Sequence, residues 1–177
     1  MERIIDMTPA DASERPLCCQ AVGAVRELCA LLETSLLDQM SRARVVEIQA
    51  QLGASLGSVL PEGLAMPHRR HLFDGELHER KPGVRSHTVL HATLFNDLLL
   101  LRSDKGAPIL VTLAKVQVKI LSELDEEGAE GDEPSFPFEL WSISSVWRLS
   151  ARSSAERARW GAAINAQGRQ RLTSLKP

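Results

Sequence analysis

Three basic side chains lie close together in one short stretch of the sequence. Arg80, Lys81 and Arg85 fall within the segment Glu79–His87. Cations that gather in this way attract phosphate groups, and each basic residue near an anionic membrane contributes about 1 kcal/mol of attraction. An ordinary exposed loop with a few charges is nevertheless the commoner form of such a segment. Weak, non-selective attraction to an anionic surface is the alternative.

The other reactive side chains do not form the motif of a conventional enzyme. Serines are frequent, but none lies in a nucleophile-elbow motif, and no glycine-rich phosphate loop is present. Clustered carboxylates occur only between Ser122 and Pro134, where seven acidic residues and no basic one predict a solvated loop rather than an ion site. The five histidines, all between positions 68 and 91, lack metal-ligand spacing. We expect no catalytic residue, metal or cofactor.

Length and composition are typical of a soluble globular protein. The chain has 177 residues, 44% hydrophobic and 25% charged, and its net charge of −2 argues against a general nucleic-acid binder. Cys18, Cys19 and Cys29 lie in one predicted helix and are poorly placed to bridge, which favours a reducing setting. No stretch reaches the ~20 apolar residues of a membrane-spanning helix. We expect one or two domains in a cytoplasmic protein.

From Leu72 onward the hydrophobic pattern is that of strands. The segment His87–Ser103 predicts two strands joined at Asn96-Asp97, because apolar and polar residues alternate before the turn and an apolar run follows it. Gly75 marks a place where two backbones can approach closely. The expected strands are Leu72–Glu79, two within residues 88–102, Ile109–Thr112, Val116–Leu121, Phe136–Ser142 and Val146–Ala151.

A capped amphipathic helix is expected after the last strand. Ser153 and Glu156 have capping-box spacing, in which each side chain satisfies the other residue's amide. Trp160, Ala163 and Ile164 form one apolar stripe. All three tryptophans have the spacing of core residues rather than of a ligand platform. Seven strands followed by one such helix predict an α+β fold in which the helix plugs an open barrel.

The first sixty residues have a helical pattern, with one helix from about Pro16 to Met40 and a further helical stretch after it. Apolar residues follow an a/d seam at Cys18, Val22, Val25, Cys29, Leu32 and Leu36. Leu28, Leu31 and Leu37 lie outside this seam, so the apolar surface is wider than one partner helix needs. Either these helices pack on each other, or they belong to a larger bundle whose interior is exposed. Gly53–Pro67 predicts a boundary.

Residues from about Arg69 to Arg169 resemble a pleckstrin-homology (PH) domain. The resemblance rests on Gly75-Glu76-Leu77, on LFNDLLL from Leu94 to Leu100, and on the run from Trp147 to Ile164. LFNDLLLL is similar to the hairpin of PH domains in Dbl-type Rho guanine-nucleotide exchange factors, where a helical Dbl-homology (DH) domain precedes the PH domain. The resemblance implies a seven-stranded PH-type barrel or sandwich capped by a C-terminal helix, with Trp160, Phe95 and Leu77 in structural positions.

The N-terminal region resembles the end of a DH domain. MERIIDMTP is similar to the end of the third conserved block, and QAVGAVRELCALLE to the start of the long last helix, with Glu33 where an asparagine often touches the GTPase. A DH domain is about twice as long as this portion. We therefore expect a partial DH region at 1–62, a PH domain at 63–170 and a tail at 171–177, in a fragment, short isoform or degenerate relative of such a factor.

The resemblance implies a module in Rho-family GTPase signalling that acts through protein contacts and weak membrane attraction. Glu33, Arg69 and Arg70 are the candidate GTPase contacts, although a solvated linker is the commoner outcome for a basic cluster such as His68–His71. Exchange needs a surface that prefers the nucleotide-free GTPase, and a partial bundle is not expected to present one. We therefore expect a non-enzyme. An active minimal exchange factor is the alternative, and the oligomeric state stays open.

A phosphoinositide-dependent membrane-targeting module is a further alternative. The resemblance would assign phosphate binding to Arg80, Lys81 and Arg85, at the periphery of the plasma membrane. However, Glu79 stands where lipid-binding PH domains have an early lysine, and no arginine pair follows in the second strand. Tight, headgroup-selective binding is therefore not expected.

Overall fold

The structure is a computed structural model that describes residues 14–57, 59–80, 87–104, 106–114, 116–121, 136–143 and 145–174. The predicted helix tail at residues 1–7, the acidic loop, and Lys81 and Arg85 of the basic segment lie outside these residues. The chain divides into two compact units, Met1–Ala43 and Arg44–Pro177. The predicted domain limits at residues 62 and 170 stay a prediction.

One helix, α2 (Arg15–Leu52), covers both helical stretches that the sequence predicts. Pro16 lies in its first turn, where the missing N–H removes no intrahelical hydrogen bond. The expected break after Met40 does not occur, because no proline or glycine lies between that residue and the end of the helix. The helix ends at Gly53, whose φ of 49° is in the left-handed region and whose N–H donates to the carbonyl of Gln49 at 3.1 Å.

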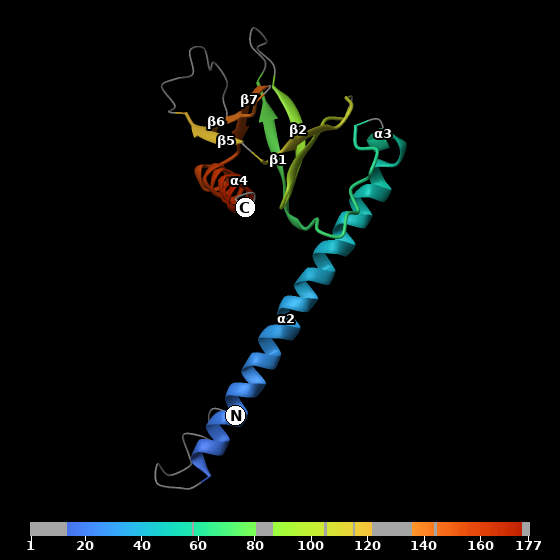
Figure 1. The fold of residues 1–177 in the computed structure, drawn as a ribbon. Coiled ribbons are helices and arrows are strands. Elements are labelled where there is room, and N and C mark those ends of the chain that lie inside the picture. The colour runs from blue at the N-terminus through green and yellow to red at the C-terminus, as the bar shows by residue number, and fades with distance from the viewer. Residues whose placement is uncertain are drawn as a thin grey trace. The chain divides into compact units, whose positions relative to one another are not determined.

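The second unit is built on a seven-stranded antiparallel sheet, and the predicted fold class is confirmed (Figure 1). Its strands are β1 (His71–Glu79), β2 (Thr88–Phe95), β3 (Leu98–Arg102), β4 (Ile109–Thr112), β5 (Gln117–Ile120), β6 (Phe136–Trp141) and β7 (Val146–Ala151). They are hydrogen-bonded in the order β4-β3-β2-β1-β7-β6-β5. The long strand β1 pairs with β2 along its length and with β7 only at His78 and Glu79, so it joins the two halves of the sheet.

The last helix, α4 (Ser154–Ser174), packs against β5, β6 and β7 and closes the main hydrophobic core (Figure 1). Trp160 and Ile164 on this helix are buried in the same cluster as residues of β1, β2, β3, β4, β6 and β7. The helix is capped by Ser153, whose Oγ accepts a hydrogen bond from the amide of Glu156 at 3.1 Å. The return bond differs from the prediction, because the Glu156 carboxylate accepts from the amide of Arg152 at 3.2 Å.

A second core lies on the other face of the sheet. Leu98 and Leu100 of β3 pack with Val45 and Ile48 from the end of α2, and with residues of the short helix α3 (Ala54–Gly57) and the segment after it. Leu99 and Leu101 of the same strand face the main core. These four consecutive leucines are all buried because β3 is covered on both faces.

Candidate functional site

The turn between β2 and β3 is joined to the segment that precedes β1 by a buried ion pair. The guanidinium of Arg69 donates to both carboxylate oxygens of Asp97, with Nε–Oδ1 at 2.9 Å and Nη2–Oδ2 at 2.8 Å. Its Nη1 donates to the carbonyls of Gly63 at 3.2 Å and Leu64 at 3.0 Å. Arg69 is 5% exposed and Asp97 6%. The guanidinium of Arg69 is therefore engaged in hydrogen bonds within the chain, although Arg69 is a candidate GTPase contact in the sequence-based prediction.

Asn96 fixes the same turn from its other side. Its amide N–H donates to the carbonyl of Arg70 at 3.0 Å, and its side-chain oxygen accepts from the amide of Arg70 at 2.8 Å. Its side-chain nitrogen donates to the carbonyl of His68 at 3.0 Å. The two residues predicted only to form a turn therefore also hold the segment leading from α3 to β1. Any partner that contacts this segment meets a fixed surface.

A charged surface lies on the outward face of β1, β2 and β3. Glu76, His91 and Arg102 are opposite one another in the strand register, and Asp74 is opposite Thr93 in a neighbouring row. These residues, with Arg44 of α2, line a shallow depression of about 280 Å³. We call it the outer charged face. The lining is of mixed charge, with Asp74 and Glu76 beside Arg44 and Arg102.

Arg44 and Asp74 form the best-connected pair of the outer charged face. The Nη2 of Arg44 lies 3.0 Å from Asp74 Oδ2, while its Nη1 lies 2.7 Å from Glu47 Oε2. Hydrogen bonds to Glu47 and Asp74 raise the pKa of Arg44 above its ordinary value. Burial alone would raise the pKa of Asp74, but hydrogen bonds from Thr93 and Arg44 and the nearby His71 outweigh it and lower that pKa. Both groups are thus charged at neutral pH.

The other charged residues of the outer charged face are less fully engaged in close ion pairs and hydrogen bonds. Glu76 forms an ion pair with Arg152, and its Oε1 lies 3.9 Å from Nδ1 of His91. His91 Nε2 also lies 3.8 Å from Asp104 Oδ1. The Nε of Arg102 is buried and has no hydrogen-bond acceptor among the residues that the structure describes. A buried N–H that lacks an acceptor costs free energy, so this end of the outer charged face is less stabilised than the Arg44–Asp74 end.

The sequence singled out none of the ion pairs of this face. Arg44 and Asp74 are thirty residues apart, so only the fold brings them together. A signal was present, because charged or polar residues stand at the outward positions of β1 and β2 next to fully buried ones. Without the strand register, these positions could not be assigned to a common surface.

The remaining predicted site residues are not among those that line this face, and two of them are not described. Arg80 lies directly after β1, and its amide donates to the carbonyl of Arg148 at 3.0 Å. Its partners in the basic segment, Lys81 and Arg85, are outside the described residues. Glu33 is exposed on the part of α2 that belongs to the first unit. Arg70 is half-buried, with its Nη1 2.7 Å from the carbonyl of Pro67.

Three residues were expected to be structural, and all three are buried. Trp160 is 1% exposed, while Phe95 and Leu77 are 0% exposed. Trp160 and Leu77 lie in the main core, and Phe95 lies in the second core. These side chains therefore position the site and do not form part of it.

Metal-binding clusters and membrane-spanning helices are both absent from the described residues. These residues contain no group of three or more histidine, cysteine or acidic side chains that could hold a metal ion. None of the helices within those ranges is long and apolar enough to cross a membrane. The arrangement is one of ion pairs and hydrogen-bonded turns at a protein surface.

Comparisons with known proteins give a match in structure but none in sequence. No family model and no curated protein matches the chain. The DH/PH fragment of PDZ-RhoGEF, solved in complex with human RhoA, matches at a TM-score of 0.65 and 20% identity over 96% of this chain. The DH/PH domains of PDZ-RhoGEF in complex with GTP-γ-S-activated RhoA match at 0.66 and 21% over 95%.

An activated truncation of Vav1 in its apo form matches at a TM-score of 0.66 and 20% identity over 94% of this chain. The chain spans 50% of the length of the two PDZ-RhoGEF chains and 42% of the Vav1 chain. The matched region includes both the helix α2 and the sheet with α4, since it covers almost all of this chain. The chain therefore has the fold of a PH domain preceded by a long helix, as found in the DH/PH fragments of Rho guanine-nucleotide exchange factors.

Proposed function

We propose that this chain is a PH module joined to the last helix of a DH domain, and that it acts in Rho-family GTPase signalling by binding other proteins. The observation that carries the proposal is the match of 94–96% of the chain to DH/PH fragments. Two of those fragments were solved with RhoA bound, which makes a Rho-family GTPase the proposed kind of partner. The protein would work in the cytosol.

The chain by itself is proposed to bind without accelerating nucleotide exchange. Exchange requires a surface that binds the nucleotide-free GTPase more tightly than the nucleotide-bound one. The described part of the first unit consists of a single helical segment. One helix offers few positions for contacts that differ between the two GTPase states, so it favours binding of similar strength to both.

Glu33 and Arg70 are the proposed GTPase contacts that have accessible side-chain surface. Glu33 is exposed on α2, and Arg70 is partly exposed beside the fixed β2–β3 turn. Arg69, by contrast, is proposed to act indirectly. Its bond to Asp97 holds the backbone from which the Arg70 side chain projects. Charged contacts of this kind set the association rate and the choice of partner more than the affinity.

Binding to purified Rho-type GTPases tests the proposal. The full chain is immobilised, and RhoA in nucleotide-free, GDP-bound and GTP-γ-S-bound forms is passed over it. We expect binding that Glu33→Arg or Arg70→Ala weakens about three- to tenfold. Lys119→Ala is the matched control, because it removes an exposed charge on β5. Absence of binding to every Rho-family member in all three states would overturn the proposal.

Release of a fluorescent nucleotide from the same GTPases separates the two proposals about exchange. We expect release at the background rate when the chain is added in excess. Acceleration well above background would support the alternative of an active minimal exchange factor. That result would still support a GTPase as the partner. It would overturn only the proposal that the chain does not accelerate nucleotide exchange.

Weak membrane attraction is proposed to assist this binding at the plasma membrane. Arg80, Lys81 and Arg85 would supply the charge, and such attraction falls as salt rises because the Debye length drops from ~10 Å at 0.1 M to ~3 Å at 1 M. Co-sedimentation with phosphatidylserine vesicles should therefore decrease with salt and be lost when the three residues are replaced by alanine. Persistence after that replacement would place the lipid site elsewhere, and a strong preference for one phosphoinositide would favour a lipid-targeting module.

A further inference from the structure

The turn between β6 and β7 carries the most exposed large apolar side chain in the part of the chain that the structure describes. Ile143 in this turn is 80% exposed. Trp141, the last residue of β6, is 46% exposed, and Val146, the first residue of β7, is 48% exposed. Trp141 and Val146 are opposite each other in the strand register, so their side chains lie on one face of the sheet. We call these three residues the β6–β7 tip.

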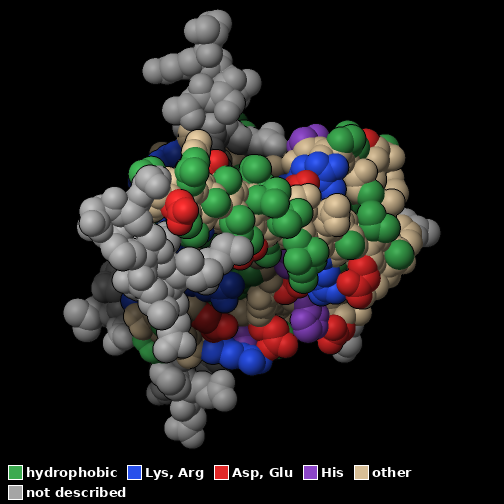
Figure 2. Space-filling view, turned by 90° about the horizontal axis from the view of Figure 1, so that it is seen from below, with side chains coloured by type: hydrophobic (Ala, Val, Ile, Leu, Met, Phe, Trp, Pro, Cys, Tyr) green, Lys and Arg blue, Asp and Glu red, His purple; other side chains and the backbone are tan. Residues whose placement is uncertain are grey.

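The polar groups next to the β6–β7 tip are hydrogen-bonded within the hairpin. Exposed hydrophobic side chains occur at several places on the surface, as Figure 2 shows, so exposure alone does not indicate a site. At the tip, the amide of Ser142 donates to the carbonyl of Ser145 at 2.9 Å, and the amide of Ser145 donates to Ser142 Oγ at 3.2 Å. The indole Nε1 of Trp141 donates to Glu139 Oε2 at 2.9 Å. These groups keep their partners when the tip leaves water, which lowers the cost of its transfer into an apolar medium.

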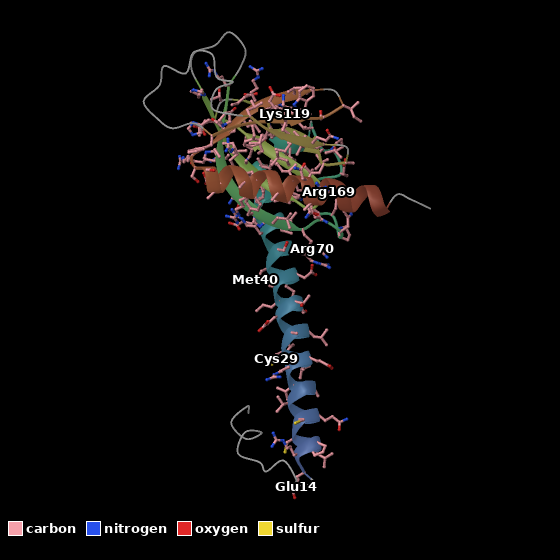
Figure 3. The ribbon with its side chains drawn as sticks, turned by 90° about the vertical axis from the view of Figure 1, so that its left-hand side faces the viewer. Glu14, Cys29, Met40, Arg70, Lys119 and Arg169 are labelled. Atoms are coloured by element: carbon pink, nitrogen blue, oxygen red, sulfur yellow. The ribbon has the colours of Figure 1, made fainter. Side chains whose placement is uncertain are left out.

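Two basic side chains stand in the next outward row behind the tip. Glu139 of β6 is opposite both Lys119 of β5 and Arg148 of β7. Lys119, labelled in Figure 3, is exposed. The side chain of Arg148 is 62% exposed, although its Nε donates to Glu139 Oε1 at 2.9 Å. Glu139 is 6% exposed, so this row presents its two cations to solvent and keeps its anion covered.

The spacing of the two rows matches the layers of a membrane surface. Two residues along a strand cover about 7 Å. The polar headgroup layer on each side of a bilayer is about 5–8 Å thick. With β6 and β7 upright on a membrane, a tip that reaches the hydrocarbon boundary therefore places Lys119 and Arg148 among the lipid phosphates.

The basic segment Glu79–His87 begins at the same end of the sheet. The strands β1 and β7 are antiparallel, so β1 ends where β7 begins. The amide of Arg80 donates to the carbonyl of Arg148 at 3.0 Å, directly beyond the pair of Glu79 and Leu149. The charge that is proposed to draw the chain to an anionic membrane therefore begins beside the tip.

A membrane fits this tip better than a second protein does. A stable protein interface takes about 20–30 residues from each partner, and three apolar side chains are few by that measure. A membrane needs no partner of complementary shape. One marginal apolar anchor combined with a basic patch is enough for stable attachment to an anionic membrane.

We propose that the β6–β7 tip inserts into the boundary of an anionic lipid membrane, where Trp141, Ile143 and Val146 contact the acyl chains. The inference rests on the membrane attraction in the proposed function and adds an apolar anchor to it. Each of the two signals is marginal alone, so stable attachment needs both. The partner is the lipid surface itself and not one kind of headgroup.

Quenching by brominated lipids tests the insertion. The full chain is added to vesicles of phosphatidylserine and phosphatidylcholine whose acyl chains carry bromine near the headgroup. Trp141 is the tryptophan that reports on the tip, because Trp160 is 1% exposed and Trp147 packs against the main core. We expect the vesicles to quench the wild-type emission. Trp141→Phe should remove the quenching and keep the binding, since it retains an aromatic ring, whereas wild-type binding without quenching overturns the proposal.

A polar substitution in the turn tests the energetic contribution of the tip. Ile143→Ser should weaken vesicle binding about tenfold at fixed salt, because it removes an apolar side chain from the contact. Its salt dependence should remain that of the wild type, since no charge changes. Val46→Ser is the matched control, because Val46 is 56% exposed on α2, outside the hairpin, and its replacement should leave binding unchanged. Equal binding of Ile143→Ser and the wild type overturns the proposal.

The same measurements separate failure of the insertion from failure of the proposed function. Salt-sensitive binding that shows no quenching and survives Ile143→Ser would retain the electrostatic attraction and overturn only the insertion. Absence of vesicle binding at every salt concentration would overturn both. RhoA binding that Ile143→Ser weakens, without quenching by lipid, would assign the tip to a protein contact and also overturn the insertion.

Discussion

A Cβ atom placed on Gly75 would lie 3.1 Å from Cζ2 of Trp160. The indole is 1% exposed and also packs on the ring of Phe73, with the ring centroids 4.5 Å apart. The close approach that the sequence predicted at Gly75 is therefore real, but it is made by a side chain of α4 and not by a second backbone. This contact fixes how α4 closes the main core.

Replacement of Gly75 by alanine should reduce the free energy of unfolding by about 1 kcal/mol. The added methyl group overpacks the core against a ring that cannot move into solvent, at a cost of about 1–3 kcal/mol. That cost exceeds the gain of about 0.5–1 kcal/mol from removing glycine from a strand. Urea denaturation followed by tryptophan fluorescence measures the difference.

Gly161→Ala is the matched control, since the residue follows Trp160 directly. A Cβ at this position would lie 3.5 Å from Cδ1 of Ile120 and 3.6 Å from Cγ1 of Val118, which is ordinary contact. Helix propensity then predicts stabilisation by about 0.5–1 kcal/mol. Stabilisation by both variants would show that the indole does not limit the space at Gly75.

The buried pair of Arg69 and Asp97 makes a second prediction about stability. Arg69→Ala leaves the Asp97 carboxylate buried without its counter-charge and should cost about 3–5 kcal/mol. The double variant Arg69→Met, Asp97→Leu should recover part of this loss, because it removes both charges. Arg42→Ala is the control, since its pair with Asp38 is on the surface, and it should cost less than about 0.5 kcal/mol. Equal losses for Arg69→Ala and Arg42→Ala would contradict a structural role for the buried pair.

The strands could be predicted from the sequence because the spacing of apolar and polar residues follows the spacing of buried and exposed positions. Alternation in β2 and the apolar run of β3 define strands whether or not their partners are known. The continuous apolar run of β3 is the only sequence feature that indicates that both faces of this strand are covered. The run does not show that the end of α2 covers the second face, because Val45 and Ile48 could equally pack in a helix bundle.

The site was less predictable because it depends on pairs that are distant in sequence. Arg69 and Asp97 are twenty-eight residues apart, and an arginine in a basic cluster ordinarily indicates an exposed linker. Asn96 and Asp97 are predicted to form a turn because side chains of these types hydrogen-bond to their own backbone in turns. The bonds that they make to the segment before β1 are tertiary, so no local pattern records them.

Asp74 makes the stability depend on pH in the acid range. Its folded-state pKa lies below the ordinary value of 3.8, so the folded state binds this proton less readily than the unfolded chain. The stabilising contribution is therefore fully present above pH ~5 and is lost as the pH falls through the lowered pKa. Asp74→Asn should lower stability at pH 6 and flatten the decline between pH 5 and 3. Thermal melts of both proteins across this range measure the effect. An unchanged decline in Asp74→Asn would show that other carboxylates cause it.

Leu99 and Leu100 are adjacent and both 0% exposed, yet they belong to different cores. Leu99→Ala and Leu100→Ala remove the same atoms and should each cost about 2–5 kcal/mol. Because local opening follows local packing, Leu100→Ala should speed amide exchange first at Val45–Leu52 of α2, which packs on that side. Leu99→Ala should speed exchange across the barrel strands, which share the main core with α4. Hydrogen exchange read out by mass spectrometry separates the two patterns. The same pattern in both variants would mean that the two cores open as one unit, and that the end of α2 is no less stably held than the strands it covers.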